Sequence, residues 1–479
     1  MTKNKNMSLK SAAALGAFVL GMTGAASAFA AATITIQNGD AAGVGFNDPT
    51  VVAPVGGNLG TTLGQQRLIA FQTAADKWGA TLDSPVPILV LATWEPLSCT
   101  ATSATLGSAG ATSVFRDFAG APISGSWYSG ALTSKLVNSD ANEGSPHIRA
   151  RFNINLGKST CLAGSPFYLG LDSNAGTGVD LVTVLEHEFA HGLGFQTFTS
   201  GASGAQLSNF PSVWDNFLWD NSTSKRWVDM SNAERVTSAL NFRKLAWLGA
   251  NVNSKVPTVL SIGTPRLNIS GPSASTAVGD YPVGTASFGV ALSSPGVSGQ
   301  LMPVVDQANG TGLACSPLTG GNALAVNGRV ALIDRGTCGF AVKAKNAQDA
   351  GAIGVVIANN AAGSPPSLGG ADPTVVIPVI SVSLADATIL KAKLTKRTRT
   401  SSGVIANLAV NPNQYVGADT QGRMLMFTPN PYQSGSSVSH WDTLAFPNQL
   451  MEPAINSDLT HEVTVPFDLT FQLLKDIGW

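Results

Sequence analysis

The chain has 479 residues, a formal net charge of -1 and only 12% charged residues, with 51 glycines. Its length allows more than one domain with a buried core. The near-neutral charge gives no electrostatic basis for binding nucleic acid or an anionic membrane surface, so neither is expected as a partner. Few charges and many glycines are typical of a loop-rich exported protein.

The first thirty residues predict export. Lys3, Lys5 and Lys10 precede an apolar run of small residues, which ends in the sequence Ala-Ser-Ala-Phe-Ala at 26–30. This order is that of a signal peptide, predicted to span residues 1–30. No later run is long enough for a membrane-spanning helix. The sequence therefore predicts a secreted protein, with the periplasm and the cell surface as alternative destinations.

Periodic patterns follow the signal peptide. An alternating run at 33–37 and a β-rich run at 86–94 predict strands, and the amphipathic stretch at 65–78 predicts a helix between them. A second alternating run, IRARFNINL, follows at 148–156. The four cysteines of an exported chain are expected to form disulfides, for which three pairings are possible.

The stretch LEHEFAHGLGF at 185–195 contains the pattern His-Glu-x-x-His. Residues four apart lie on one face of a helix, so His187 and His191 can bind one zinc ion. Glu188 can then act as the general base toward a water molecule whose pKa the zinc lowers. Leu181, Leu185 and similarly spaced apolar residues predict the buried face of this helix. Gly192 and Gly194 are expected to weaken and end it.

A catalytic zinc usually has three protein ligands, and the third is not fixed by this spacing. One common arrangement places a histidine six residues after the second, where this chain has Thr197. Glu234 fits a second helix that donates a glutamate, and an aspartate ligand is also possible. The candidates are His147, Asp215, Asp220, Glu234, His440 and His461, or a residue that the sequence does not single out.

The middle of the chain predicts a strand, a helix and a second strand in RVALIDRGTCGFAVKAKNAQDAGAIGVVIANN, with Gly351 after the helix and a further apolar run at 375–382. This stretch resembles the protease-associated (PA) domain family, a small α/β module of secreted proteases and sorting receptors. The resemblance implies an inserted domain over residues 259–408. With the cysteines divided between domains, it also implies the pairs Cys99–Cys161 and Cys315–Cys338.

Residues 409–479 contain too little apolar sequence for a core of their own, so we expect them to fold back onto residues 31–258. This segment contains GSSVSHWDTLAFPNQLMEP and ends in LTFQLLKDIGW. Together with HEFAHGLGF, these motifs resemble the leishmanolysin-type metzincins, which are zinc endopeptidases. The resemblance implies that His440 is the third zinc ligand, that Met451 lies in the turn beneath the metal, and that 148–156 is an edge strand that pairs with substrate.

The expected fold is therefore of the α+β class: a metzincin-like peptidase domain, with a mixed sheet and an active-site helix, split by an α/β PA domain. The predicted function is zinc-dependent hydrolysis of peptide bonds in proteins or peptides. The alternative is an exported protein-binding or adhesion protein that keeps a structural metal site. One catalytic Zn²⁺ is expected, whereas loops such as FNDPT and DSNAG lack the dense ligand pattern of a calcium site. No pattern indicates an oligomeric state.

Overall fold

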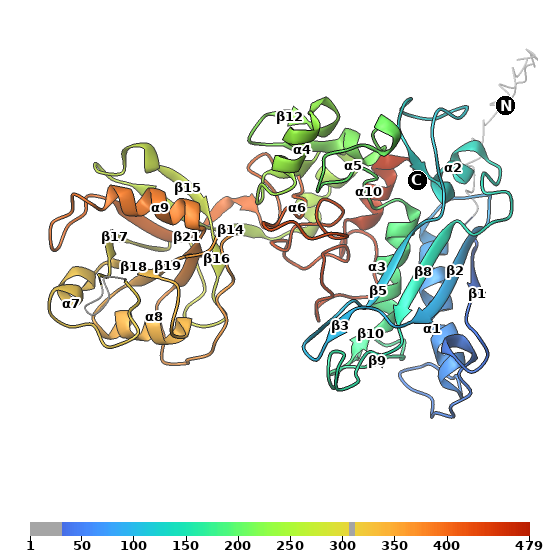
Figure 1. Ribbon diagram of the computed structural model, residues 1–479, viewed down its shortest axis with the longest axis horizontal. Coiled ribbons are helices and arrows are strands. Elements are labelled where there is room, and N and C mark those ends of the chain that lie inside the picture. The colour runs from blue at the N-terminus through green and yellow to red at the C-terminus, as the bar shows by residue number, and fades with distance from the viewer. Residues whose placement is uncertain (1–30, 306–311) are drawn as a thin grey trace, which may run out of the picture.

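The structure, a computed structural model, describes residues 31–305 and 312–479. The predicted signal peptide lies outside the described residues. Figure 1 shows two lobes joined by a narrow connection. The inserted lobe is built by residues 262–415, and the histidine lobe by residues 31–261 and 416–479. No helix in the described part of the chain is long and apolar enough to cross a membrane.

The helices of the histidine lobe are α1 (Leu63–Thr81), α2 (Gly130–Val137), α3 (Leu181–Leu193), α4 (Asn232–Ser238), α5 (Ala250–Asn253), α6 (Val256–Val259) and α10 (Thr470–Ile477). Its strands are β1 (Ile34–Asn38), β2 (Ile88–Glu95), β3 (Cys99–Thr100), β4 (Ser103–Ala104), β5 (Gly107–Ala111), β6 (Val114–Phe115), β7 (Tyr128–Ser129), β8 (Ile148–Asn153), β9 (Phe167–Tyr168), β10 (Val179–Asp180), β11 (Leu218–Asp220), β12 (Lys225–Arg226) and β13 (Leu245–Trp247).

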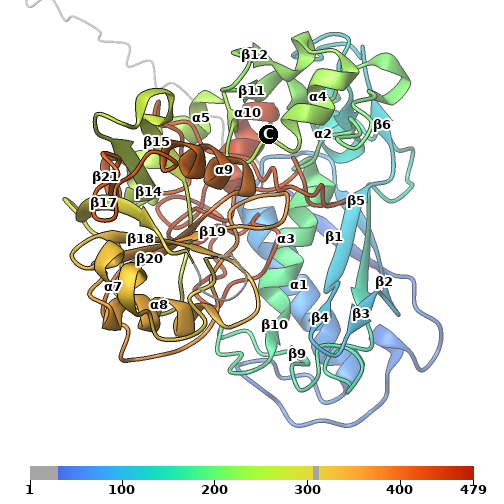
Figure 2. The same cartoon turned by 60° about the vertical axis from the view of Figure 1, so that its left-hand side comes forward.

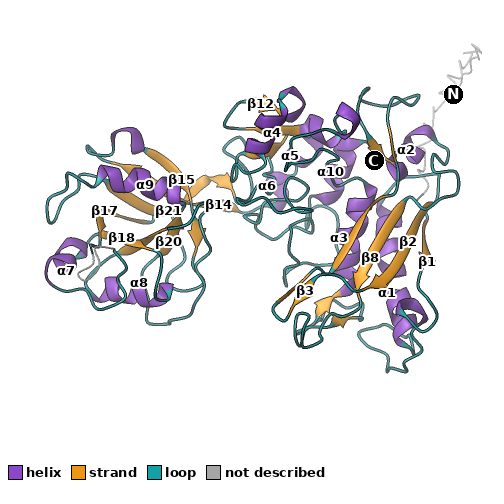
Figure 3. Cartoon of the chain, viewed as in Figure 1, coloured by secondary structure: helices purple, strands orange, loops and turns teal. Residues whose placement is uncertain are grey.

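A four-stranded sheet in the order β1-β2-β8-β5 forms the frame of the histidine lobe. Strands β1, β2 and β8 are parallel, and β5 is antiparallel to β8. Helices α1 and α3 contact each other, and α3 also contacts β5 and β8 (Figure 3). The indole Nε1 of Trp78 in α1 donates a 3.0 Å hydrogen bond to the carbonyl oxygen of Glu186 in α3. The α3 helix is thereby held between a second helix and the sheet.

The expectation that 148–156 forms the edge strand is wrong. Strand β8 occupies 148–153 and lies between β2 and β5, and the edge is the glycine-rich strand β5. Every second residue of β8 is buried, as the alternation predicts: Ile148, Ala150 and Phe152. Alternation indicates a strand with one buried face, but it does not indicate the position of that strand in the sheet. Strand β5 lacks β-branched residues, so strand propensity gave no indication of it.

One hydrophobic core joins the two parts of the histidine lobe. Residues before 261, including Leu185 and Trp214, share a single buried cluster with Trp441, Met451 and Leu473 from the C-terminal part. The indole of Trp479 donates a 2.9 Å hydrogen bond to the carbonyl oxygen of Leu193, at the end of α3. The C-terminal part therefore completes the core around α3, as expected from its small apolar content.

The inserted lobe contains α7 (Gly320–Val326), α8 (Phe340–Asp349) and α9 (Leu384–Lys393). Its strands are β14 (Ile262–Ser270), β15 (Gly279–Pro282), β16 (Gly284–Thr285), β17 (Val297–Pro303), β18 (Val330–Asp334), β19 (Gly354–Ala358), β20 (Val379–Val382) and β21 (Ile405–Tyr415), in the sheet order β15-β14-β21-β17-β18-β19-β20-β16. The predicted strand, helix and strand unit is confirmed as β18, α8 and β19. Gly351 follows α8 with φ +90°.

The inserted lobe has two cores, one on each face of its sheet. In β18, Val330 and Leu332 pack in the cluster that contains Leu390 of α9, whereas Ala331 and Ile333 pack in the cluster that contains Ala344 of α8. This alternation follows from the two-residue period of a strand. Disulfides join Cys315 to Cys338 in this lobe and Cys99 to Cys161 in the histidine lobe, which are the expected pairs.

The expected end of α3 at Gly192 and Gly194 is confirmed, with Gly192 as the second-last residue of the helix. A Cβ at this position would lie 2.4 Å from Cγ2 of Ile148 in β8, and glycine therefore allows the helix to approach the sheet closely. The helix ends at Leu193, and Gly194 follows with φ +127°.

Replacement of Gly192 by alanine is expected to lower the free energy of unfolding by about 1–3 kcal/mol, because the clash with Ile148 outweighs the gain in helix propensity. Urea denaturation of Gly192→Ala, Ile148→Ala and the double variant would measure this cost. The Ile148→Ala substitution should cost less in the Gly192→Ala background, since it removes the clashing atoms. Strictly additive costs would contradict the contact.

Candidate metal centre and active site

The α3 helix carries the first two histidines. It begins after Asp180, whose Oδ1 accepts a 3.0 Å hydrogen bond from the backbone N–H of Thr183 and so caps the helix. The rings of His187 and His191 lie with centroids 4.9 Å apart, and both residues are buried. The spacing of the motif thus gives the arrangement expected on one face of a helix.

His440 reaches these rings from the C-terminal part of the chain. Its carbonyl oxygen accepts a 2.9 Å hydrogen bond from the N–H of Phe427, and the N–H of Val438 donates a 2.8 Å bond to the carbonyl of Phe427. Met426 in turn donates a 2.9 Å bond to Leu245 of β13. His440 therefore follows a turn, on a segment held to the rest of the histidine lobe by backbone hydrogen bonds.

Three Nε2 atoms converge at this point. The Nε2 of His440 lies 3.2 Å from that of His187 and 3.2 Å from that of His191. Each Nδ1 faces a backbone carbonyl. His187 Nδ1 lies 2.7 Å from the oxygen of Leu450, and His191 Nδ1 lies 2.7 Å from that of Phe195. His440 Nδ1 lies 2.9 Å from the oxygen of Ser436. A carbonyl accepts only, so each Nδ1 carries the proton and each Nε2 presents a lone pair.

Three lone pairs pointing at one another repel unless a cation lies between them. Tetrahedral zinc with Zn–N bonds of 2.0–2.1 Å places its nitrogen ligands about 3.3 Å apart, close to the spacing of these Nε2 atoms. The hydrogen bond from each Nδ1 to a carbonyl is the usual support of a metal-binding histidine. The residues therefore fit a zinc ion. In the described residues they form the one group of His, Cys, Asp or Glu side chains close enough to share a metal.

Burial keeps the three imidazoles neutral. Desolvation lowers the pKa of His187 to about 4 and that of His191 to about 3, where the nearby His187 adds to the effect. Desolvation also lowers the pKa of His440 well below its usual value. An imidazole must be neutral to donate its lone pair, so all three are ready to bind a metal at neutral pH.

Glu188 lies beside the histidines and faces the same cleft. Burial raises the pKa of its carboxyl to about 8, and a backbone hydrogen bond from Ala109 and the charge of Arg151 oppose this shift. A carboxyl with a raised pKa can accept and return a proton near neutral pH. Gly107 of β5 leaves room for the Glu188 side chain, since a Cβ at this position would lie 3.0 Å from both Cγ and Oε1 of Glu188.

A cleft of about 1190 Å³ opens over the histidines and Glu188. Its walls are formed by residues 103–109 around β4 and β5, by the loop 173–180, and by two C-terminal stretches at 432–440 and 452–459. Within the described ranges, no lysine or arginine lines it. In Figure 2, α3, the helix that contains His187 and His191, lies between β5 and the C-terminal segments.

The turn at Met451 supports the site through its backbone. Met451 is fully buried, and its carbonyl oxygen accepts a 2.8 Å hydrogen bond from the N–H of Trp441, next to His440. The carbonyl of Leu450 orients His187, and the N–H of Leu450 donates a 2.7 Å bond to Asp468. Sequence analysis missed Asp468 and Ala109. Ala109 acts through its backbone, and the carboxylate of Asp468 accepts from a backbone N–H, so neither forms a recognisable pattern of side-chain types with the histidines.

The other candidate ligands lie elsewhere. Glu234 is partly exposed, pairs with Lys225 and belongs to the capping box of α4. Asp220 accepts hydrogen bonds from the N–H groups of Ser222 and Thr223. His461 pairs with Asp180 at 3.0 Å. None of them belongs to the group of three histidines.

Asp215 has a structural role next to the site. It is fully buried and accepts 2.6 Å hydrogen bonds from the hydroxyls of Thr197 and Thr199. Thr197, which occupies the position of a possible histidine ligand, donates its N–H to Oγ of Ser439 at 3.2 Å. Thr197 thus connects the end of α3 to the residue before His440.

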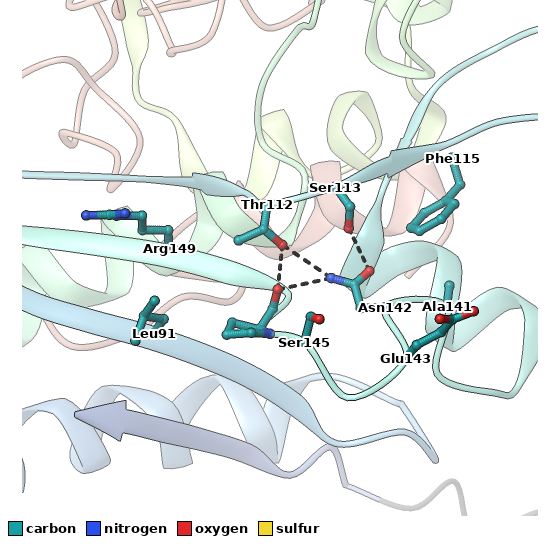
Figure 4. Close-up of a pocket in the computed structure, with 10 residues that line it drawn as sticks. Leu91, Thr112, Ser113, Phe115, Ala141, Asn142, Glu143, Ser145 and Arg149 are labelled. Atoms are coloured by element: carbon teal, nitrogen blue, oxygen red, sulfur yellow. Dashed lines mark hydrogen bonds between the residues drawn. The ribbon is translucent and has the colours of Figure 1, made fainter. Parts of the chain in front are cut away.

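A second hollow, of about 520 Å³, lies between Leu91, Thr112, Asn142 and Arg149 (Figure 4). The amide of Asn142 donates to Thr112 Oγ1 and to the carbonyl of Pro146, and its oxygen accepts from Ser113. These polar groups satisfy one another, and none of the three histidines lines the hollow. It is therefore separate from the metal centre.

The PA domain family matches residues 297–390, so the inserted lobe contains a PA domain, as the sequence predicted. ER degradation-enhancing alpha-mannosidase-like protein 3 from Homo sapiens is 43% identical over 81 residues, and the protein of that name from Xenopus laevis is 40% identical over 82 residues. Each alignment covers 17% of this chain and 8% of the relative. The chain thus spans only a small part of the curated relatives it matches.

Solved structures show partial likenesses. A zinc aminopeptidase from Bacillus subtilis has 25% sequence identity and a TM-score of 0.22, over 34% of this chain and 35% of that chain. An aminopeptidase from Aneurinibacillus sp. strain AM-1 has 20% identity and a TM-score of 0.23, over 32% of this chain and 31% of that chain. Likenesses at this level define neither the fold nor the activity of the histidine lobe.

His147 was a candidate ligand near the cleft, but the structure places it in a separate buried network. It lies before β8, with its Nε2 3.1 Å from Ser134 Oγ and 3.3 Å from Asp140 Oδ1, and its Nδ1 accepts a 3.2 Å bond from the N–H of Leu89. Burial lowers the pKa of His147 below its usual 6.5, an effect that Asp140 partly opposes.

Replacement of His147 by alanine is expected to destabilise the protein more at pH 8 than at pH 5. Below pH 6.5 the unfolded chain protonates this histidine while the folded protein keeps it neutral, so wild-type stability falls as the pH falls. The variant lacks this pH dependence. The difference in free energy of unfolding between wild type and variant should therefore shrink by up to about 1.4 kcal/mol for each pH unit below pH 6.5. Urea denaturation at both pH values tests this, and a difference that widens toward pH 5 would contradict it.

Proposed function

We propose that this protein is a secreted zinc-dependent endopeptidase of the leishmanolysin-like metzincin type. In this proposal, the histidine lobe is the peptidase domain and the inserted lobe contains the PA domain. The observation that carries the proposal is the convergence of three imidazole lone pairs beside a buried glutamate in an open cleft. His187, His191 and His440 hold the zinc, and the turn at Met451 forms the floor of the site.

A bound zinc ion supplies Lewis-acid chemistry for a peptide carbonyl and a water nucleophile. Glu188 takes the proton of the attacking water and passes it to the leaving amine. A zinc site with structural function usually has four protein ligands, whereas three are present here. The open cleft on the remaining side favours catalysis over a purely structural metal site.

Strand β5 offers a way to bind an extended peptide. It is the edge of its sheet and lines the cleft next to Glu188, so its outward backbone groups can pair with a substrate strand. A peptide bound in this way continues on both sides of the scissile bond. This geometry favours cleavage within a chain.

The proposal is tested by casein cleavage and zinc content of the purified mature protein. Glu188→Gln is expected to lower cleavage by at least a thousandfold with zinc retained, because it removes only the base. His440→Ala is expected to lose most of its zinc, whereas Glu234→Gln should keep it. A wild-type protein that binds zinc but cleaves neither casein nor a peptide library would reject the proposal in favour of an exported binding protein.

Replacement of Gly107 by alanine is expected to lower kcat several-fold without loss of zinc, because the new methyl group presses on the Glu188 carboxylate. Gly110→Ala on the same strand is the matched control, since its Cβ would meet its nearest atom, Oε1 of Gln196, only at 3.6 Å. Steady-state kinetics on a fluorogenic peptide and zinc analysis would compare them. Equal kinetics in the two variants would exclude crowding of Glu188.

A further inference from the structure

The inserted lobe contacts the stretch of chain that carries His440. This stretch, here called the His440 segment, comprises residues 424–442. It pairs with β13 through Met426, and its residues 432–440 line the cleft. Beyond the connecting strands β14 and β21, two further contacts join the inserted lobe to the two sides of this segment.

The first contact lies before His440 in the chain. The N–H of Ser364, in the loop after β19, donates a 3.3 Å hydrogen bond to the carbonyl of Asn430, and the N–H of Asn430 donates a 3.3 Å bond to Oγ of Ser364. Gly363 approaches the same carbonyl so closely that a Cβ would lie 2.5 Å from the Asn430 oxygen. This reciprocal pair fixes the segment just before Tyr432, where the cleft wall begins.

The second contact lies after His440 and passes through Arg243. Its Nε donates a 3.2 Å hydrogen bond to Oδ1 of Asp442, and one of its terminal nitrogens donates a 3.2 Å bond to the carbonyl of Val283, between β15 and β16 of the inserted lobe. The side chains of Arg243 and Asp442 are only 14% and 1% exposed, so this ion pair is shielded from water. Arg243 therefore ties the residues after His440 to the inserted lobe.

The two contacts bracket the part of the segment that orients the ligand. Between Asn430 and Asp442 lies Ser436, whose carbonyl accepts the proton of His440 Nδ1 and so directs Nε2 toward the other histidines. Moving either end of this loop changes the position of Ser436 relative to α3. Metal affinity is sensitive to such supporting contacts, and their loss commonly costs 10–100-fold.

We propose that the inserted lobe positions His440, with Gly363, Ser364 and Arg243 as positioning residues. The PA domain is then a structural part of the metal centre, and disturbance of its contact with the His440 segment weakens metal binding without any change in the ligands. This inference rests on the proposed zinc site, because it concerns the geometry of that site's third ligand.

The test measures the zinc affinity of the full-length mature protein, by competition of the metal-free protein with a chromophoric chelator. Gly363→Ala pushes the inserted lobe away from Asn430, and Gly370→Ala is its matched control. Gly370 has φ +128° against +124° for Gly363, but a Cβ there would meet only ordinary contacts at 3.7 Å or more. Arg243→Met removes the bridge to Asp442, and Arg266→Met, which breaks the ion pair with Asp280 inside the inserted lobe, is its control.

Gly363→Ala and Arg243→Met are expected to weaken zinc binding at least fivefold, with both controls within twofold of wild type. Should Arg243→Met fail to fold because it leaves Asp442 unpaired, Gly363→Ala alone decides. In the His440→Ala background, Gly363→Ala should have no further effect on zinc affinity, because the contact acts through that ligand.

If the contact at Gly363 only stabilised the fold, the variants would show different zinc affinities. An equal loss of affinity from Gly363→Ala with and without His440 would overturn the inference, as would wild-type affinity in a folded Gly363→Ala variant. A wild-type protein that binds no zinc would instead reject the proposed function, and this inference with it. Affinity is measured without substrate, so the result does not depend on catalytic activity.

Discussion

The mutual repulsion of three imidazole lone pairs is the constraint on which the histidine lobe depends. Two of the imidazoles stand on a helix, and the third arrives on a segment separated from it by the whole inserted lobe. Each ring is held by a backbone carbonyl, so the protein directs all three lone pairs into one buried space. Burial suppresses the alternative of protonating them. On the proposed function, a cation bound by the three rings would remove this repulsion and join the two parts of the lobe.

The remaining architecture is arranged around α3. Its residues are buried on all sides, by α1, by the sheet and by the C-terminal part. Such a helix cannot adjust its position, which suits a scaffold for ligands that must stay within a fraction of an ångström. The packing leaves no room for a side chain at Gly192, where α3 meets the sheet. It also leaves none at Gly107, beside Glu188.

Much of this organisation could be predicted from the sequence, although by two different routes. The spacing of His187 and His191 predicted their shared helix face, and the pattern around residue 330 predicted the strand, helix and strand of the PA domain. His440 was one of six candidates by residue type, and only the family resemblance singled it out. Its place beside the other histidines depends on long-range packing, which no local pattern encodes.

The errors have physical causes. Strand β5 was missed because glycine and alanine carry no strand preference. The family resemblance implied that β8 is the edge strand, and the alternation of its residues could not correct this because it does not reveal neighbours. The supporting groups of the site, such as the carbonyls of Leu450 and Ser436, belong to the backbone and can be found only from coordinates. The contacts between the inserted lobe and the His440 segment were beyond prediction for the same reason.

The distance along the chain between the histidines has a consequence for biosynthesis. His440 follows His191 by 249 residues, with the inserted lobe between them. During translation the helix that carries the first two histidines emerges long before the third, and the core around it stays open until the last stretch is added. On the proposed function, a nascent or partly exported chain has no complete metal centre.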